Sequence, residues 1–189
     1  YTTLFRSKKS QGLVDVHGNT IIPLTANQAI LPPSDNMLRL AKVEKKQIAK
    51  AYYDLDAEVM VRIPSSEKGK FGAFSHNLAP VSLDDELYFI DKKGNKVIGG
   101  LSKAFLSNEG YRVVQKGSAF GAIDSTGAVV IPIEYTNSLT SVNNGRLGVQ
   151  KNASWFYVDM KGQIVSDKYD RIGNFHQGYA SVCLNKLWR

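Results

Sequence analysis

The sequence is poor in the residues that build disulfide frameworks and metal sites. Its 189 residues include one cysteine, Cys183, and three histidines. A single cysteine excludes an internal disulfide framework and a zinc site with several cysteine ligands, and it leaves the redox compartment open. Long hydrophobic runs are also absent, because no apolar stretch approaches the about 20 residues that a membrane-spanning helix needs.

Acidic residues are in the minority. The chain carries 24 lysines and arginines against 17 aspartates and glutamates, which gives a formal net charge of +7. Such a balance favours attraction to anionic surfaces, although it does not determine a fold. Hydrophobic residues make up 43% of the chain, enough to bury a substantial core, so we expect a folded protein.

Signatures of catalysis are missing as well. His17, His76 and His176 occupy non-equivalent positions, so they do not form a recognisable metal triad. Cys183 lies on a predicted strand without a histidine and aspartate pair that would activate it. We find neither a glycine-rich phosphate loop nor a nucleophile elbow. The sequence therefore predicts a protein that is not an enzyme and has no cofactor or metal.

What the sequence does contain is a phrase of about 35 residues that occurs five times. Its best copy begins Phe120-Gly121-Ala122-Ile123-Asp124 and continues through Val130-Ile131-Pro132. Aligned on Asp15, Asp56, Asp91, Asp124 and Asp159, the copies follow at steps of 41, 35, 33 and 35 residues. They start near residues 11, 52, 87, 120 and 155, with partial copies at both ends. A period of this length indicates stacked repeats in a single domain over residues 1–189.

Each copy reads as strands joined by tight turns. A first strand with period-two alternation ends in Asp-x-x-Gly, where the carboxylate can accept backbone N–H groups and the glycine supplies a positive φ. The predicted structural turn residues are Asp15, Gly18, Asp91, Gly94, Asp124, Gly127, Asp159 and Gly162. A second, β-branched strand follows, then a loop of roughly ten residues and a third strand with the frame Gly/Asn-x-Ala/Leu-x-Val/Leu.

One junction between copies is longer than the others. The third strand leads to the next copy in six residues at four junctions, as from Val149 to Trp155, but Leu40 to Tyr52 takes twelve. We interpret the six extra residues as an inserted basic loop. Its lysines are candidate contacts for an anion or a partner, with a solvated surface loop as the alternative. These lysines are Lys42, Lys45, Lys46 and Lys50.

Recurring aromatic residues are expected in the core. Fixed positions in a repeat are typical of packing, which predicts burial of Phe105, Phe120, Trp155 and Phe175. Tyrosines outside the periodic frame are the candidates for an exposed binding face. They are Tyr53, Tyr111 and Tyr179.

These phrases resemble the bacterial WG repeat family, also called KWG repeats. The closest copy combines residues 120–124 with Val130-Ile131-Pro132 and Tyr135, while Gly178-Tyr179-Ala180-Ser181-Val182 fits the end of the consensus. The namesake Trp-Gly pair is replaced, for example by Phe120-Gly121 and Trp155-Phe156, which implies a divergent member. The resemblance brings no general catalytic or ligand-binding residues.

The expected architecture is all-β: about five three-stranded meander units of about 35 residues, stacked as a curved solenoid or open superhelix. A closed, propeller-like ring of five units is the alternative. The expected function is that of a non-catalytic interaction or scaffold module for a protein partner. A module for a polyanion or glycan, such as an acidic polysaccharide or nucleic acid, is the alternative. Cytoplasm, cell envelope and secretion all remain open as compartments.

Overall fold

The computed structural model describes residues 3–7, 10–43, 47–63 and 69–188, and within these ranges the secondary structure is strand and turn without helix. None of the described segments is a helix with the length and hydropathy needed to cross a membrane. The prediction of an all-β repeat fold is confirmed, while its open and closed arrangements both stay predictions. The chain divides into two compact units, which we call unit 1 (Tyr1–Asp85 with Phe89–Lys96) and unit 2 (Glu86–Tyr88 with Val97–Arg189).

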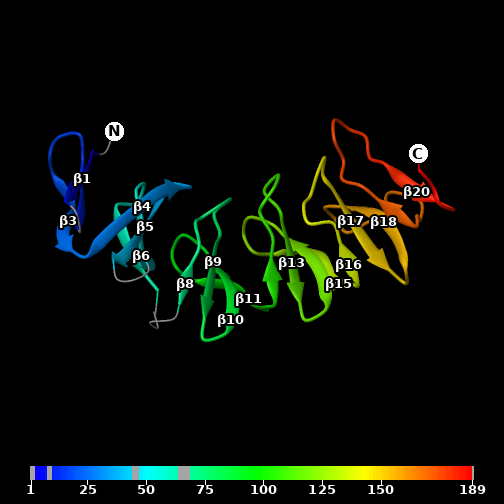
Figure 1. Ribbon diagram of the computed structural model, residues 1–189, viewed down its shortest axis with the longest axis horizontal. Helices are drawn as coiled ribbons and strands as arrows, with labels where there is room; N and C mark the ends of the chain where they lie inside the picture. The colour runs from blue at the N-terminus through cyan, green and yellow to red at the C-terminus, as the bar shows by residue number, and fades with distance from the viewer. Residues whose placement is uncertain (1–2, 8–9, 44–46, 64–68, 189) are drawn as a thin grey trace. The chain divides into compact units, whose positions relative to one another are not determined.

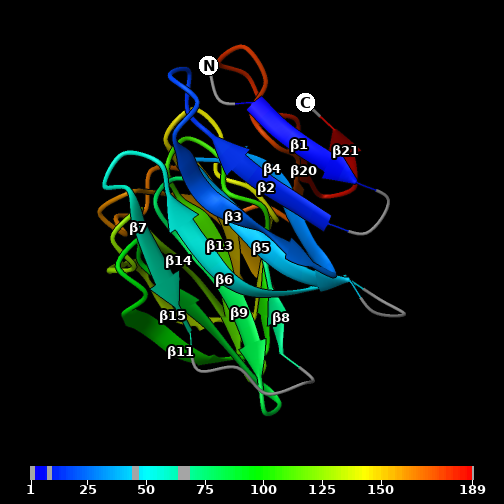
Figure 2. The same ribbon diagram turned by 90° about the vertical axis from the view of Figure 1, so that its left-hand side faces the viewer.

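Unit 1 contains two complete antiparallel sheets, which are nearest the viewer in Figure 2. The first has the order β1-β2-β3, with β1 at Thr3–Ser7, β2 at Ser10–Val14 and β3 at Thr20–Ala26. The second has the order β4-β5-β6-β7, with β4 at Gln28–Ser34, β5 at Met37–Val43, β6 at Gln47–Asp54 and β7 at Val59–Arg62.

The division between the units runs through the third sheet, of order β11-β10-β9-β8. Its strands are β8 at Lys70–Phe71, β9 at Ala79–Leu83, β10 at Glu86–Ile90 and β11 at Lys96–Leu101.

Unit 2 contains three further sheets in which neighbouring strands are consecutive in the sequence (Figure 1). The first comprises β12 at Lys103–Ala104, β13 at Arg112–Lys116, β14 at Ala119–Ile123 and β15 at Val129–Tyr135. The second comprises β16 at Asn137–Ser138, β17 at Arg146–Lys151 and β18 at Ser154–Asp159. The third comprises β19 at Arg171–Ile172, β20 at Val182–Leu184 and β21 at Leu187–Trp188.

A short fourth strand lies where the sequence predicted a loop of about ten residues. In unit 2 it is represented by β12, β16 and β19, each two residues long and paired with the following strand. Two residues are too few to show a period-two pattern, so sequence reasoning gave three strands per unit. The third strand of one copy and the first strand of the next form a hairpin, so each sheet combines parts of two copies.

The Asp-x-x-Gly segments form the same turn in all four copies that carry them. In the turn at Asp124, the amide of Gly127 donates to the Asp124 carbonyl oxygen over 3.1 Å, and the Asp124 carboxylate accepts the amides of Thr126 and Ala128. The glycine φ angles are +85° at Gly18, +86° at Gly94, +88° at Gly127 and +75° at Gly162.

Three of these glycines have a second role that the sequence did not reveal. A Cβ atom on Gly127 would lie 2.6 Å from Val97 Cγ2, and one on Gly94 would lie 2.9 Å from Val61 Cγ1. A Cβ on Gly162 would be 3.4 Å from Pro132 Cδ, whereas Gly18, in the first copy, meets nothing within 4 Å. These turns therefore pack against the second strand of the preceding copy.

The core is built from buried residues of the first, second and third strands and of the segments that connect them. One buried cluster in unit 2 contains Val113, Ala122, Ile131, Leu147 and Phe156, together with Tyr135, Val142, Val149 and Val158. In unit 1 the corresponding cluster contains Leu13, Ile22, Ile30, Leu38, Leu40 and Tyr53.

The aromatic residues predicted as core are only half-buried. Phe120 and Trp155 are the second residues of β14 and β18. Phe105 packs against the buried cluster of unit 2, and the Phe175 ring lies 4.7 Å from that of Tyr157. Full burial falls on the next positions, as in Phe156 and Tyr157. Of the tyrosines expected on an exposed face, Tyr53 is buried and Tyr111 packs against the core, while Tyr179 is 82% exposed.

The second copy is shifted in register from its sequence alignment. Leu40 pairs with Ala51 as Val149 pairs with Phe156, and Asp54 rather than Asp56 accepts the turn amides, from Asp56 and Ala57. The copy therefore begins two residues earlier than the predicted 52. Beyond Leu40 and Ala51 the hairpin continues through a bulge to the pair Val43 and Gln47, so described residues on both sides of the insertion extend the two strands.

Candidate functional site

The repeated carboxylates are occupied within their own turns. The Asp15 carboxylate accepts the side-chain amide of Asn19 and the backbone amides of Asn19 and His17, and these bonds lower the pKa of Asp15. Hydrogen bonds from Gln163 and Lys161 likewise lower the pKa of Asp159. Within the described ranges no group of three or more histidine, cysteine, aspartate or glutamate side chains could hold a metal ion.

The predicted lysine site is not assembled as one loop. Lys42 belongs to β5 and Lys50 to β6, on the two arms of the long hairpin, while Lys45 and Lys46 lie outside the described residues. Their role as anion contacts stays a prediction.

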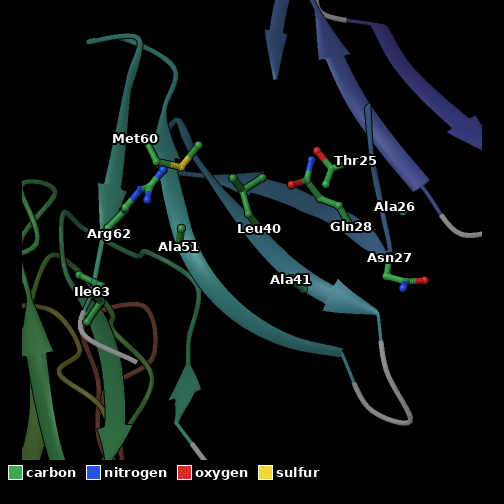
Figure 3. Close-up of a pocket in the computed structure, with 10 residues that line it drawn as sticks. All are labelled: Thr25, Ala26, Asn27, Gln28, Leu40, Ala41, Ala51, Met60, Arg62 and Ile63. Atoms are coloured by element: carbon green, nitrogen blue, oxygen red, sulfur yellow. The ribbon is translucent and has the colours of Figure 1, made fainter. Parts of the chain in front are cut away.

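Unit 1 contains a groove that we call the edge groove, with a volume of about 530 Å³. Met60 and Arg62 project from β7 on one side, Thr25 and Gln28 stand on the opposite side, and Leu40 lies between them (Figure 3). Its other lining residues are Ala26, Asn27, Ala41, Ala51 and Ile63. The floor is apolar and the two sides carry polar groups.

Strand register explains the floor of the edge groove. Leu40, Ala51 and Arg62 are directly paired across β5, β6 and β7, so they stand on one face of the sheet. Ala51 occupies the position that Phe156 fills in the fifth copy. A methyl group in place of an aromatic ring leaves room above the strand.

A second groove, which we call the turn groove, lies in unit 2 and has a volume of about 560 Å³. It is lined by Phe105, Leu106, Ser107 and Asn108 on one side and by Thr140 and Ser141 on the other. The side chain of Leu106 is 87% exposed, the highest value among the large hydrophobic residues described as exposed.

Two turns that precede third strands, at Asn108–Tyr111 and Asn143–Arg146, are joined by hydrogen bonds that fix the two sides of the turn groove. The Asn108 side-chain amide donates to the Val142 carbonyl oxygen over 2.6 Å. The Glu109 carboxylate accepts the Asn144 amide over 2.7 Å and the Gly145 amide over 2.8 Å. Charge-assisted bonds to two successive amides hold the turns in register.

Neither groove was predicted, although the sequence carries a trace of each. Leu106 lies two residues before the start of the turn that precedes the third strand. The equivalent residues in other copies are Ala73, Ser141 and Asn174, so a large apolar residue at this position is exceptional. Arg62 lies as far from the turn aspartate Asp54 as Pro23 lies from Asp15 and Pro132 from Asp124, so an arginine replaces the proline of these two copies. Such contrasts become readable once the register of each copy is known.

Comparison with protein families assigns the repeats. The family model described as WG containing repeat matches residues 120–155 and 155–188, which are the last two copies. These two copies are WG repeats. The earlier copies share their strand order and turn hydrogen bonds. A search of curated proteins finds no match to the sequence.

Solved structures that match the backbone are distant. The crystal structure of the eukaryotic initiation factor matches at a TM-score of 0.44 and 10% identity, covering 89% of this chain and 52% of that one. Hsv2p from Kluyveromyces lactis matches at 0.43 and 14% identity, covering 96% and 67%, and Hsv2 from Kluyvelomyces marxianus at 0.43 and 14%, covering 98% and 66%. The WG-repeat chain thus spans about half to two thirds of these proteins.

The presence of WG repeats indicates a module for binding or scaffolding, because stacked repeats offer an extended surface on a fixed frame.

Proposed function

We propose that this WG-repeat protein is a non-catalytic module that binds another protein, and that the turn groove of unit 2 is part of the contact surface. The exposure of Leu106 is the observation that carries the proposal. A large aliphatic side chain that is 87% exposed beside a groove, on a hydrogen-bonded scaffold, is typical of a contact residue.

The chemistry of the turn groove favours a protein over a polyanion. Its lining combines Phe105 and Leu106 with neutral serine, threonine and asparagine side chains and has no lysine or arginine. Binding of nucleic acid or an acidic polysaccharide depends on cationic contacts to phosphate or carboxylate groups. Apolar anchors with a polar rim are the usual composition of a protein interface.

Site-specific photo-crosslinking tests the proposal. A benzophenone amino acid placed at Leu106 in the native host is expected to crosslink to a discrete protein, and Leu106→Ser is expected to abolish co-purification of that protein. The matched control is the same crosslinker at Lys161, an exposed residue in the Asp159 turn. An apolar contact should also withstand added salt, whereas polyanion binding falls steeply.

Two outcomes would contradict the proposal. Equal crosslinking at Leu106 and Lys161 would show that the groove has no preferred partner. Retention on heparin or RNA that disappears with salt, together with no effect of Leu106→Ser, would support the polyanion alternative.

A further inference from the structure

We propose that the edge groove binds an extended peptide of the partner protein that carries an acidic side chain next to aliphatic residues, with Arg62 pairing the carboxylate. This inference rests on the proposed function, since it assigns a second contact site and a peptide chemistry to the same binding module.

The first argument for an acidic ligand is charge complementarity. Arg62 is exposed, and in the part of the chain that the structure describes no carboxylate lies within salt-bridge distance of it. Other cations have partners: Lys151 lies 2.7 Å from Glu134, and Lys92 lies 3.9 Å from Asp56. None of the ten residues that line the edge groove is acidic. A guanidinium at the side of a groove without internal carboxylates matches an anionic group supplied from outside.

The opposite side supplies an acceptor. The Gln28 side-chain nitrogen donates to the carbonyl oxygens of Gln11, at 3.1 Å, and Pro23, at 3.2 Å, which fixes the orientation of the amide. Its oxygen therefore points toward Leu40 in the groove (Figure 3). An acceptor opposite a cation suits a peptide, which offers backbone N–H groups beside an acidic side chain.

The floor accounts for the aliphatic part of the ligand. Leu40, Ala41 and Ile63 are buried, and Met60 is 40% exposed, so its thioether can adapt to an incoming side chain. A volume of about 530 Å³ lies within the range of about 300–1,000 Å³ found for binding pockets. Small residues at Ala41 and Ala51 keep this volume open.

Fluorescence polarisation with peptide pools tests the inference on the full chain. The pools are acetylated, amidated pentapeptides with a central aspartate, asparagine or lysine between randomised aliphatic and serine positions. We expect the aspartate pool to bind at least fivefold more tightly than the asparagine pool. Arg62→Gln should remove that difference, and Arg171→Gln, the matched change of an exposed arginine in unit 2, should retain it. Ala51→Leu should weaken binding of the aspartate pool while a thermal melt shows the protein folded.

Several results would overturn the inference. They are the absence of binding by every pool, equal affinity for aspartate and asparagine pools, or a preference for aspartate that survives Arg62→Gln. Displacement of the pool by heparin equally in the parent and in Arg62→Gln would assign the binding to a polyanion elsewhere. If these tests fail while crosslinking at Leu106 persists, the edge groove is refuted and the proposed protein-binding function stands.

Discussion

The fourth and fifth copies of the repeat differ in how their first strand pairs with the second, and one position of the first strand shows a large contrast in side-chain size. The fourth has Gly121, paired with Val114, and the fifth has Phe156, paired with Val149. After Gly121, the strand β14 pairs with β15, a continuous strand of seven residues. In the fifth copy, pairing of β18 with the segment that follows it is reduced to bridges at Trp155 with Tyr169 and Val158 with Ile164, and to a hydrogen bond from the Val165 amide to the Tyr157 carbonyl oxygen.

In the fourth copy the glycine lies directly against the second strand. A Cβ atom on Gly121 would lie 2.6 Å from the Ile131 carbonyl oxygen and 2.7 Å from that of Pro132. Gly12 in the first copy approaches the Ile22 carbonyl oxygen in the same way, at 2.9 Å. In the first and fourth copies a side chain at this position would collide with the backbone of the second strand. The glycine of the repeat consensus permits close approach of two backbones across a bulge.

The fifth copy compensates with side chains. The Tyr157 amide donates to Ser166 Oγ over 2.9 Å, and the Phe156 ring packs on Tyr135 with centroids 6.1 Å apart. The comparison teaches that a copy can be closed by backbone pairing, as in the fourth copy, or with the help of side-chain contacts, as in the fifth.

The largest expected effect is that of Phe156→Ala. Phe156 is 4% exposed and lies in the core cluster of unit 2, so its truncation should lower the free energy of unfolding by about 3–5 kcal/mol. Urea denaturation measures the change. Trp155→Ala, one residue earlier and half-buried, is the control and should cost less. Equal costs would mean that Trp155 is a core residue after all.

Gly121→Ala should follow, with a cost of about 3 kcal/mol, because backbone atoms cannot yield to the added methyl group. Gly145→Ala is the control: its φ is +62°, but a Cβ there meets nothing within 4 Å. That variant should lose only about 1 kcal/mol, from backbone strain. Thermal melts that rank the two variants in the opposite order would contradict the account of the glycine position.

Tyr157→Phe is expected to cost about 1–2 kcal/mol, because it leaves the partly buried Gly173 carbonyl oxygen without its 2.6 Å hydrogen bond. Tyr52 makes the same bond to Gly72 at 2.8 Å, so Tyr52→Phe should cost a similar amount. Strongly unequal costs in denaturation experiments would show that the second and fifth copies do not share this contact.

Alkaline pH offers an independent measurement on the same residue. Burial, with a smaller contribution from Tyr169, raises the pKa of Tyr157 to about 12 from the ordinary 10.0. The unfolded chain therefore loses this proton first, and stability should be complete below pH 10 and fall as pH rises toward 12. Tyr157→Phe should flatten that fall in pH-dependent denaturation. An unchanged slope would assign the decline to other groups.

The smallest effect is expected for Glu109→Gln, which weakens the carboxylate contact to the Asn144 and Gly145 amides and should cost about 1 kcal/mol. Hydrogen exchange at these two amides should become faster. Glu134→Gln breaks the exposed ion pair with Lys151 and should leave both amides unchanged. Identical exchange in the two variants would remove the proposed link between the turns.

The sequence predicted the parts of the fold that depend on local chemistry. Period-two alternation located the longer strands. The predicted Asp-x-x-Gly turns are present, and their glycines have the expected positive φ. The strands of two residues were missed because they carry no pattern. The register of the second copy was missed because Asp54 and Asp56 are equally good turn residues by type, and only pairing with β5 distinguishes them.

The candidate site was less accessible from sequence. The edge groove exists because the small Ala51 side chain leaves space above its strand and because lining residues from separate segments lie opposite Arg62. Neither relation can be inferred from the sequence before the strand register is known. The lysines were prominent in the sequence because charge is visible without structure. Exposure of Leu106 became recognisable only against the equivalent positions of other copies.

Because each sheet joins the end of one copy to the beginning of the next, the sequence repeat and the structural module have different boundaries. The sequence boundaries near residues 120 and 155 fall at hairpins, between β13 and β14 and between β17 and β18. A recombination breakpoint there would cut through a sheet and expose unpaired strand edges, which promote aggregation. Exchange between β15 and β16, after Tyr135, would transfer an intact sheet. Arrays of this kind should therefore gain and lose units at the links between sheets, half a period away from the boundaries that a sequence alignment displays.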